Sequence, residues 1–332
     1  MLETAAAPDP ELTRCENHAP VTAASYNETV RGLTPFLFAY VCGACGAGAQ
    51  TTLAPDASKP VDAAPTARCS PTGAFGAPIA LTALDSAGED LGARFSPDEN
   101  SLVMSRTSNN QWDIYSSSRA TEGGTFSAPQ IVAAANTIYN DIWPSLSPDG
   151  LSLLFTSNRL NQSAYSPWIS KRASLTATWS TPVSVKGSTS GDDHPFFANA
   201  HSMYFTRTPT MGSADIYRAD IDASGAISNI AAVLGGVNSA AIEVVPVVSA
   251  DELRIYFGRH NGTDFDIYTA SRSAISDGFG AATPVDGLAD PGSDQLPSWV
   301  SADGCDFYYS SNAAGSMATD LFLVTRGATP AL

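Results

Sequence analysis

The stretch WPSLSPDGLSLLFTSNR, residues 143–159, decides the fold. Its centre, Ser-Pro-Asp-Gly at 147–150, is typical of a tight turn, because proline presets the backbone and glycine accepts a positive φ. Short apolar runs lie on both sides, so the stretch predicts two antiparallel strands joined by a turn. Similar short runs, separated by Gly, Pro, Ser, Asn and Asp, recur along the chain, whereas long helical periods are missing. The sequence therefore predicts an all-β protein.

This two-strand unit is repeated. Acidic residues recur at a constant interval of 51 residues, at Asp90, Asp141, Asp192, Glu243 and Asp294. After each acid come a first strand, a turn and a second strand that ends in a bulky residue, at Met104, Phe155, Phe205, Phe257 and Tyr309. A third strand opens with Asp-Ile-Tyr or a related sequence, and a fourth contains FSAP, WSTP or FGAATP. Four strands in about 51 residues match one blade of a β-propeller.

The two ends of the repeat complement each other. The fifth copy stops soon after DLFLVTR, at 320–326, without a fourth strand, while FGAPIALTAL at 75–84 is a fourth strand with no blade before it. Pairing of these two segments would complete the last blade and hide both sheet edges. We therefore predict a five-bladed β-propeller of four-stranded antiparallel blades over residues 71–327, with the ring closed by the N-terminal strand 75–84.

The same closure places two cysteines near each other. Cys69 precedes the closing strand, and Cys305 follows the first turn of the fifth copy. The second and fourth strands of an up-and-down sheet begin at the same rim, so a Cys69 to Cys305 disulfide across the seam is predicted. Two free thiols are the alternative, because connectivity is not readable from sequence.

The N-terminal region has the order of a secretion signal. One arginine, Arg31, precedes an uncharged apolar run at 33–41, and small residues follow up to Cys45. The run is too short to span a bilayer. Because this signal does not lie at position 1, we infer that translation begins at Val30 and that residues 1–29 are not part of the mature protein.

Residues 30–45 also have the form of a lipobox, in which small residues precede a lipid-bearing cysteine, here Cys45. A Cys-x-x-Cys redox or metal pair formed with Cys42 is the alternative interpretation. Residues 46–70 are rich in Ala, Pro and Thr and poor in aromatic residues, which is typical of a linker. The sequence thus predicts an exported chain with a lipid anchor and a tether before the propeller.

Composition limits the partners. The chain has 33 acidic and 17 basic residues and a net charge of −16, so its field repels phosphate backbones and anionic lipids. No nucleic-acid partner is expected, and contact with a membrane is expected only through the lipid anchor. An apolar content of 43% indicates a globular chain.

The string P-x-x-S-P-D-G-x-x-L-x-F-x-S-N-R, from Pro144 to Arg159, resembles the WD40-like Pro-Asp repeat of TolB-type β-propellers. The resemblance covers all five copies and implies a propeller of the bacterial cell envelope, exported to the periplasm or anchored to the outer membrane. TolB-type propellers have six blades and a separate N-terminal domain, and this sequence has five copies. The resemblance therefore implies the architecture rather than a particular activity.

The five repeated carboxylates, Asp90, Asp141, Asp192, Glu243 and Asp294, are expected to ring one mouth of the central channel. There they would bind a cation or a basic partner segment; the alternative is that each caps backbone amides. Residues that deviate from the repeat are the better functional clues, and near this mouth they are Trp143, Asp193, His194, Gln295 and Trp299. The alternatives are a polar rim residue for the histidine and inter-blade core for the tryptophans.

A second set of acids is expected to be structural. Asp113, Asp215 and Asp266 open the third strands across a hairpin from Arg106, Arg207 and Arg259, and we predict salt bridges between these neighbours. No catalytic residues are assigned, because carboxylates that are equivalent by repetition do not separate into an acid and a base.

The function expected from these features is an exported binding or scaffolding module of the bacterial envelope, a monomeric propeller whose partner is an envelope protein or a saccharide. The alternative is a glycosidase-like enzyme that uses the axial carboxylates. A structural protein stabilised by a cation at the acidic ring is the third interpretation. No other cofactor is expected.

Overall fold

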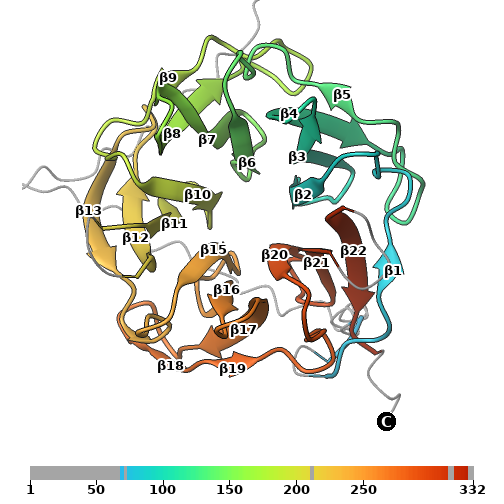
Figure 1. Cartoon of the computed structure of the whole chain (residues 1–332), viewed down its shortest axis with the longest axis vertical. Helices are drawn as coiled ribbons and strands as arrows, with labels where there is room; N and C mark the ends of the chain where they lie inside the picture. Colours follow the sequence, from blue (N-terminus) through green and yellow to red (C-terminus); the bar gives the residue numbers. More distant parts are fainter. Residues whose placement is uncertain (1–67, 71–72, 210–212, 313–317, 328–332) are drawn as a thin grey trace, which may run out of the picture. The chain divides into compact units, whose positions relative to one another are not determined.

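The computed structural model describes residues 68–70, 73–209, 213–312 and 318–327, all within the compact unit Asp62–Leu332. Five antiparallel sheets of four strands are arranged around a central axis (Figure 1). This all-β, five-bladed propeller confirms the predicted fold class. The predictions for residues 1–29, 30–45 and Cys45, and for most of the linker, lie outside the described residues. Within the described ranges, no helix has the length and hydropathy needed to cross a membrane.

The strands of each sheet are given in their order from the central axis outward. Blade one contains β2 (Asp90–Phe95), β3 (Ser101–Ser108), β4 (Gln111–Ser118) and β5 (Gln130–Ile131). Blade two contains β6 (Asp141–Leu146), β7 (Ser152–Asn161), β8 (Ala164–Lys171) and β9 (Val183–Ser184). Blade three contains β10 (Asp192–Phe197), β11 (Ser202–Arg207), β12 (Asp215–Ile221) and β13 (Ile227–Ala232).

Blades four and five follow the same order. Blade four contains β15 (Glu243–Val248), β16 (Arg254–His260), β17 (Phe265–Ser271) and β19 (Thr283–Pro284). Blade five contains β20 (Gln295–Val300), β21 (Asp306–Ser311), β22 (Asp320–Thr325) and β1 (Ile79–Ala80). A short parallel pair outside the blades is formed by β14 (Gly235–Gly236) and β18 (Phe279–Ala281).

The last blade takes its outer strand from the N-terminal end of the described chain. Strand β1 pairs antiparallel with β22, with Ile79 opposite Leu323, and the two lie side by side in Figure 1. Strand pairing is shorter than the predicted 75–84: besides β1, Phe75 forms one isolated bridge with Arg326. Cys69 and Cys305 are joined by a disulfide, with their Cα atoms 5.6 Å apart. That the pairing of β1 with β22 and this disulfide hold the ring closed stays a prediction.

A repeated arginine supports the equivalence of this N-terminal segment to a fourth strand. In four blades, the arginine that follows the third strand lies over an aromatic ring of the outer segment. The pairs, with the distance from the guanidinium carbon to the ring centre, are Arg119 with Phe126 (4.7 Å), Arg172 with Trp179 (4.3 Å), Arg272 with Phe279 (4.4 Å) and Arg326 with Phe75 (3.8 Å). Phe75 therefore occupies, in blade five, the place of the fourth-strand aromatic in the other blades.

The core lies between neighbouring blades. Second strands contribute large side chains that are almost entirely buried, such as Tyr204, Phe205 and Tyr256. Burial of one such ring stabilises the fold by roughly 1.5–3 kcal/mol. The first strands are buried on both faces, because each is enclosed by its own blade and by its neighbours. This dense packing places the functional surfaces at the strand ends and turns.

Candidate functional site

The acids that begin the inner strands of blades one to four are fully buried, at 0% exposure. Each is bound by an arginine of the second strand. The pairs, with the distance from Nε to a carboxylate oxygen where one is given, are Arg106 with Asp90 (2.6 Å), Arg159 with Asp141, Arg207 with Asp192 (2.6 Å) and Arg259 with Glu243 (2.8 Å). The prediction of an open acidic mouth is therefore wrong for these carboxylates. A guanidinium group of the chain itself occupies the place that a cation would take.

The fivefold equivalence also fails in blade five. Strand β20 begins with Gln295, which is 1% exposed and donates to the Ser293 carbonyl at 2.8 Å. Asp294 lies one residue before the strand, half-buried, and accepts the backbone N–H of Phe265 at 2.9 Å. One additional residue separates the acid of blade four, Glu243, from the equivalent position in blade five, so the constant 51-residue spacing selected the wrong neighbour.

The salt bridges predicted for Asp113, Asp215 and Asp266 are also wrong. These residues lie opposite Arg106, Arg207 and Arg259 in the ladders, but the three guanidinium groups bind the buried inner-strand acids instead. A buried charge costs several kcal/mol unless it is paired, so the inner acids are favoured as partners. Burial raises the pKa of Asp113 and of Asp215, and Asp266 accepts the Asn261 side-chain amide at 2.8 Å.

A β-bulge interrupts each inner strand of blades one to four, two residues after the acid. The residues with positive φ there are Gly92 (63°), Trp143 (57°), His194 (51°) and Val245 (54°). For a β-branched or bulky residue this conformation costs on the order of 1–3 kcal/mol. Gly92 is further required because a Cβ at this position would lie 2.9 Å from Cε3 of Trp143. Trp143 and Val245 belong to one buried apolar cluster, and the His194 ring lies against Trp143.

His194 is buried beside Trp143. Its ring centre lies 4.6 Å from that of Trp143, its Nδ1 has no hydrogen-bond partner, and its backbone N–H donates to Asp193 at 2.7 Å. Burial lowers the pKa of His194; the Asp193 carboxylate opposes this shift and the Arg94 guanidinium adds to it. A neutral imidazole packed on indole is a core element. This agrees with the inter-blade alternative for Trp143.

Arg94 is a charged group that the sequence analysis missed. It is 2% exposed, donates to the Pro297 carbonyl at 3.3 Å and lies 5.1 Å from the centre of the Phe196 ring. It forms no ion pair within the described ranges, and burial lowers its pKa to about 9. The signal available in sequence is a lone arginine near the end of an inner strand, between Ala93 and Phe95.

The other ends of the inner strands form an apolar mouth. A hollow of about 100 Å³ lies on the face of the Pro-Asp turns and is lined by residues of all five blades. One lining residue from each blade is Phe95, Leu146, Phe196, Val248 and Trp299. The ring centres of Trp299 and Phe95 lie 5.6 Å apart, with the rings tilted at 46°, and the Arg94 guanidinium lies over the Phe196 ring. We call this hollow, with the residues that line it, the turn-face mouth.

The predicted site residues are therefore divided between the two ends of the channel. Trp299 lines the turn-face mouth, whereas the acids and Asp193, His194 and Trp143 lie at the beginnings and bulges of their strands. The aromatic residues that the sequence analysis missed, Phe95 and Phe196, share one signal. Each ends or nearly ends an inner strand, just before the turn.

Three carboxylates lie as close together as the ligands of a metal ion. Ligand atoms of Glu99, Glu122 and Asp306 lie within 4.8 Å of one another, away from the channel acids. Arg68 donates to Glu122 at 3.1 Å and to Asp306 at 2.8 Å. The guanidinium supplies the positive charge that a cation would bring, so we assign no metal to this cluster.

Comparison with known proteins finds likeness in structure only. No protein-family description matches the chain, and no curated protein matches it. Among solved structures, TolB from Acinetobacter baumannii is similar at 17% identity with a TM-score of 0.47; the match covers 74% of this chain and 57% of TolB. The catalytic domain of the Coprinopsis cinerea GH62 α-L-arabinofuranosidase is similar at 10% identity with a TM-score of 0.49. This match covers 76% of this chain and 96% of the arabinofuranosidase chain. A putative TolB from Agrobacterium tumefaciens is 14% identical, with a TM-score of 0.41, and the match covers 76% of this chain and 97% of the other.

Proposed function

We propose that the protein is an exported binding module of the bacterial cell envelope that holds an apolar side chain of a partner polypeptide in the turn-face mouth. One observation carries the proposal: residues of every blade line an apolar hollow, and one of them, Phe196, lies against the buried Arg94, which has no ion-pair partner among the described residues. Concave apolar sites with a few polar groups are the usual form of binding pockets.

The size of the hollow favours a polypeptide over a saccharide. At about 100 Å³, it holds a few waters of roughly 30 Å³ each, or one side chain. Aromatic walls such as Phe95 and Trp299 suit an apolar anchor residue, which is the usual centre of a protein interface. A saccharide chain would need a longer groove.

Two features support export. The order of Arg31, an apolar run at 33–41 and small residues up to Cys45 is that of a signal with a lipid-bearing cysteine. The disulfide between Cys69 and Cys305 fits an oxidising compartment, because such bonds are rare in the cytosol. We therefore place the propeller outside the cytoplasmic membrane, with a lipid on Cys45 as its anchor.

The enzyme alternative lacks a comparable observation. A glycosidase needs two accessible carboxyl groups, roughly 5–9.5 Å apart, with different proton affinities. The axial acids Asp90, Asp141, Asp192 and Glu243 are all buried and bound to arginines. Their ion pairs favour a structural role, so a binding module is the function that we propose.

Photocrosslinking in intact cells tests the proposal. A photoreactive phenylalanine at Ala250, which lines the turn-face mouth, is expected to form a polypeptide adduct; the same residue at exposed Gln162, in the hairpin between β7 and β8, is expected to give at least tenfold less. Trp299→Ala is expected to reduce the adduct at position 250, because it removes part of the hollow's wall. Equal yields at both positions, or an adduct at 162 alone, would contradict the proposed binding face.

A further inference from the structure

The turns between first and second strands differ at one position. The residue after the turn aspartate has a positive φ in four blades, at Glu99 (54°), Gly150 (67°), Glu252 (58°) and Gly304 (71°). Blades one and four thus have a glutamate where blades two and five have a glycine. Because the backbone conformation is the same, the side chain alone distinguishes the two kinds of turn.

The glutamates fill the spaces between blades. Glu252 is 2% exposed and reaches back to blade three, where it accepts from Tyr204 Oη at 2.8 Å, Ser202 Oγ at 2.6 Å and Arg218 Nε at 2.7 Å. Burial raises the pKa of Glu252, but these hydrogen bonds outweigh burial and lower it to about 2. Glu99 likewise accepts Tyr308 Oη of blade five, at 3.0 Å. Each glutamate therefore has a tyrosine of the preceding blade as donor.

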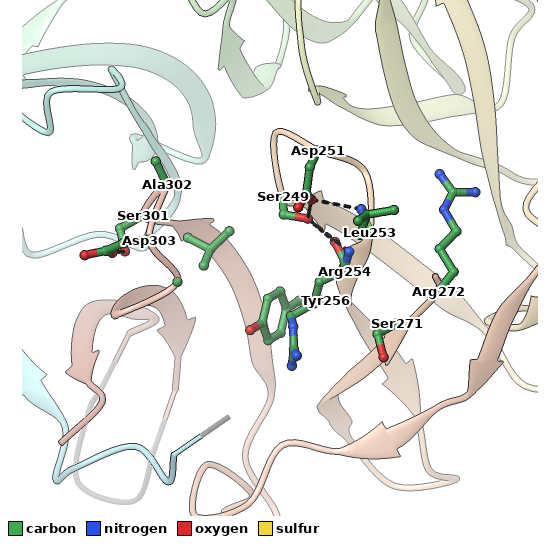
Figure 2. Close-up of a pocket in the computed structure, with 12 residues that line it drawn as sticks. Ser249, Asp251, Leu253, Arg254, Tyr256, Ser271, Arg272, Ser301, Ala302 and Asp303 are labelled. Carbon is green, nitrogen blue, oxygen red and sulfur yellow. Dashed lines mark hydrogen bonds between the residues drawn. The ribbon is translucent and has the colours of Figure 1, made fainter. Parts of the chain in front are cut away.

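The space between blades four and five has the tyrosine without the glutamate. Tyr256 is the third residue of its second strand, as Tyr204 is in blade three, and it is 1% exposed. Facing it is Gly304, where an added Cβ would meet no atom within 4 Å. A hollow of about 290 Å³ lies here, and Figure 2 shows Tyr256 and Arg254 on one side and Ser301 and Asp303 across from them.

Two donors in this hollow remain unused. The Tyr256 hydroxyl oxygen accepts from Arg326 at 3.2 Å, so its own hydrogen is left for another acceptor, and the described part of the chain supplies none. The Arg254 guanidinium has no hydrogen-bond or ion-pair partner among the described residues. Arg254 begins its second strand as Ser202 does in blade three, so it stands where the Glu252 site has a hydroxyl donor.

The acids that line the hollow do not take these donors. Asp251 accepts from Ser249 Oγ at 2.6 Å and from the Leu253 backbone at 3.0 Å. Asp303 accepts from Arg68 at 2.9 Å, and the hydrogen bonds of Arg68 lower the pKa of Asp303 to about 2. Both carboxylates are thus held in their own turns.

We propose that the hollow between blades four and five binds a carboxylate on a short aliphatic stalk, received by the Tyr256 hydroxyl and the Arg254 guanidinium. The chain itself provides the pattern, because Glu252 places such a group against the equivalent tyrosine of blade three. Hydrogen bonds from charged donors to carboxylates are about twice as strong as neutral ones. This hollow shares Val300, Ser301 and Ala302 with the turn-face mouth, but its donors Tyr256 and Arg254 do not line that mouth, and the proposal does not depend on the function of the mouth.

The corresponding hollow between blades one and two is a natural contrast. It also measures about 290 Å³ and also contains a turn glycine, Gly150. However, the third residue of its second strand is Val103, which has no hydroxyl, and a Cβ on Gly150 would lie 2.8 Å from Leu175. Of these two hollows, only the one between blades four and five has a tyrosine hydroxyl at the third position of the second strand and an arginine at the first.

The first test restores the missing group. Gly304→Glu is expected to raise the Tm by roughly 3–6 °C relative to Gly304→Gln, because the charged carboxylate accepts stronger hydrogen bonds from Tyr256 and Arg254 than the neutral amide does. In a Tyr256→Phe background this advantage is expected to fall by at least half. Equal melting temperatures for the Glu and Gln variants would overturn the proposal. Gly123→Glu and Gly123→Gln are the control pair, since Gly123 has a similar φ of 75° and open surroundings.

The second test measures binding to the wild-type chain by NMR titration. Glutarate and a blocked peptide with one glutamate are the probes, and glutaramide is the neutral control. We expect at least one acidic probe to bind at least tenfold more tightly than glutaramide, and Gly304→Glu, but not Gly123→Glu, to weaken that binding at least tenfold. Preference for glutarate would identify a free small acid, and preference for the peptide a polypeptide side chain. Equal binding of glutarate, peptide and glutaramide, or unchanged binding by Gly304→Glu, would overturn the proposal.

Discussion

Glu252→Gln is expected to lower the free energy of unfolding by about 3 kcal/mol. The substitution keeps the shape of the side chain but removes its charge, and it leaves Arg218, at 2.7 Å, and Arg272, at 3.6 Å, without their buried counter-ion. Breaking a buried ion pair by removing one partner costs roughly 3–5 kcal/mol. Urea unfolding of both proteins at neutral pH, with unchanged m-values, measures the difference.

The pH dependence of this loss provides a second readout. The pKa of Glu252 is about 2 in the folded state and 4.5 in a free side chain, so its contribution to stability is fully present above pH 4.5. It is lost as the pH falls from 4.5 toward 2, and the wild-type protein and the Glu252→Gln variant are expected to converge in stability there. Asp251→Asn, in the same turn but more exposed, is the control, with an expected loss of about 1 kcal/mol or less. A Glu252→Gln loss no larger than this control would refute the inter-blade role.

Asp192→Asn is expected to cost a similar amount, about 3–5 kcal/mol. Asp192 is 0% exposed and accepts from Arg207 Nε at 2.6 Å and from Nη2 at 2.9 Å, so the amide leaves a guanidinium without its counter-charge. Its neighbour Asp193 is partly exposed and, within the described part of the chain, accepts only the backbone N–H of His194. Asp193→Asn is therefore the matched control, with an expected change within about 0.5 kcal/mol.

These two variants separate the structural interpretation of the axial acids from the catalytic one. If Asp192 stabilises the fold, denaturation of Asp192→Asn shifts to lower urea concentration and Asp193→Asn does not. Unchanged stability of Asp192→Asn, together with loss of sugar release from an arabinan or fructan panel, would favour the glycosidase alternative instead.

The architecture was readable from sequence because the copies share a regularly spaced acid and a second strand that ends in a bulky residue. Five copies, the strand order and the partner of the N-terminal segment follow from one template. The spacing misassigned Asp294, because one inserted residue moved Gln295 into the buried position. A constant spacing in sequence therefore does not guarantee equivalent positions in the blades, because those positions are set by the hydrogen-bond register of each sheet.

The site was less predictable, because it depends on partners that are distant in sequence. Arg106 faces Asp113 in the ladder but binds Asp90, and only burial of the inner acid decides this. The turn-face mouth combines single residues of all five blades, such as Phe95 and Trp299, that share no motif. One signal was present: the alternation of Asp-Glu and Asp-Gly in the turns already distinguishes the filled spaces between blades from the open ones.

The N-terminal segment supplies the outer strand of the last blade and is tied to it by a disulfide, which fits the export that we propose. Peptide mapping of protein purified from the cell envelope, alkylated and digested without reductant, tests this tie most directly. The account predicts one linked peptide pair that contains Cys69 and Cys305, which separates on reduction. Recovery of both cysteines as alkylated free thiols would contradict the tie across the last blade and the oxidising compartment together.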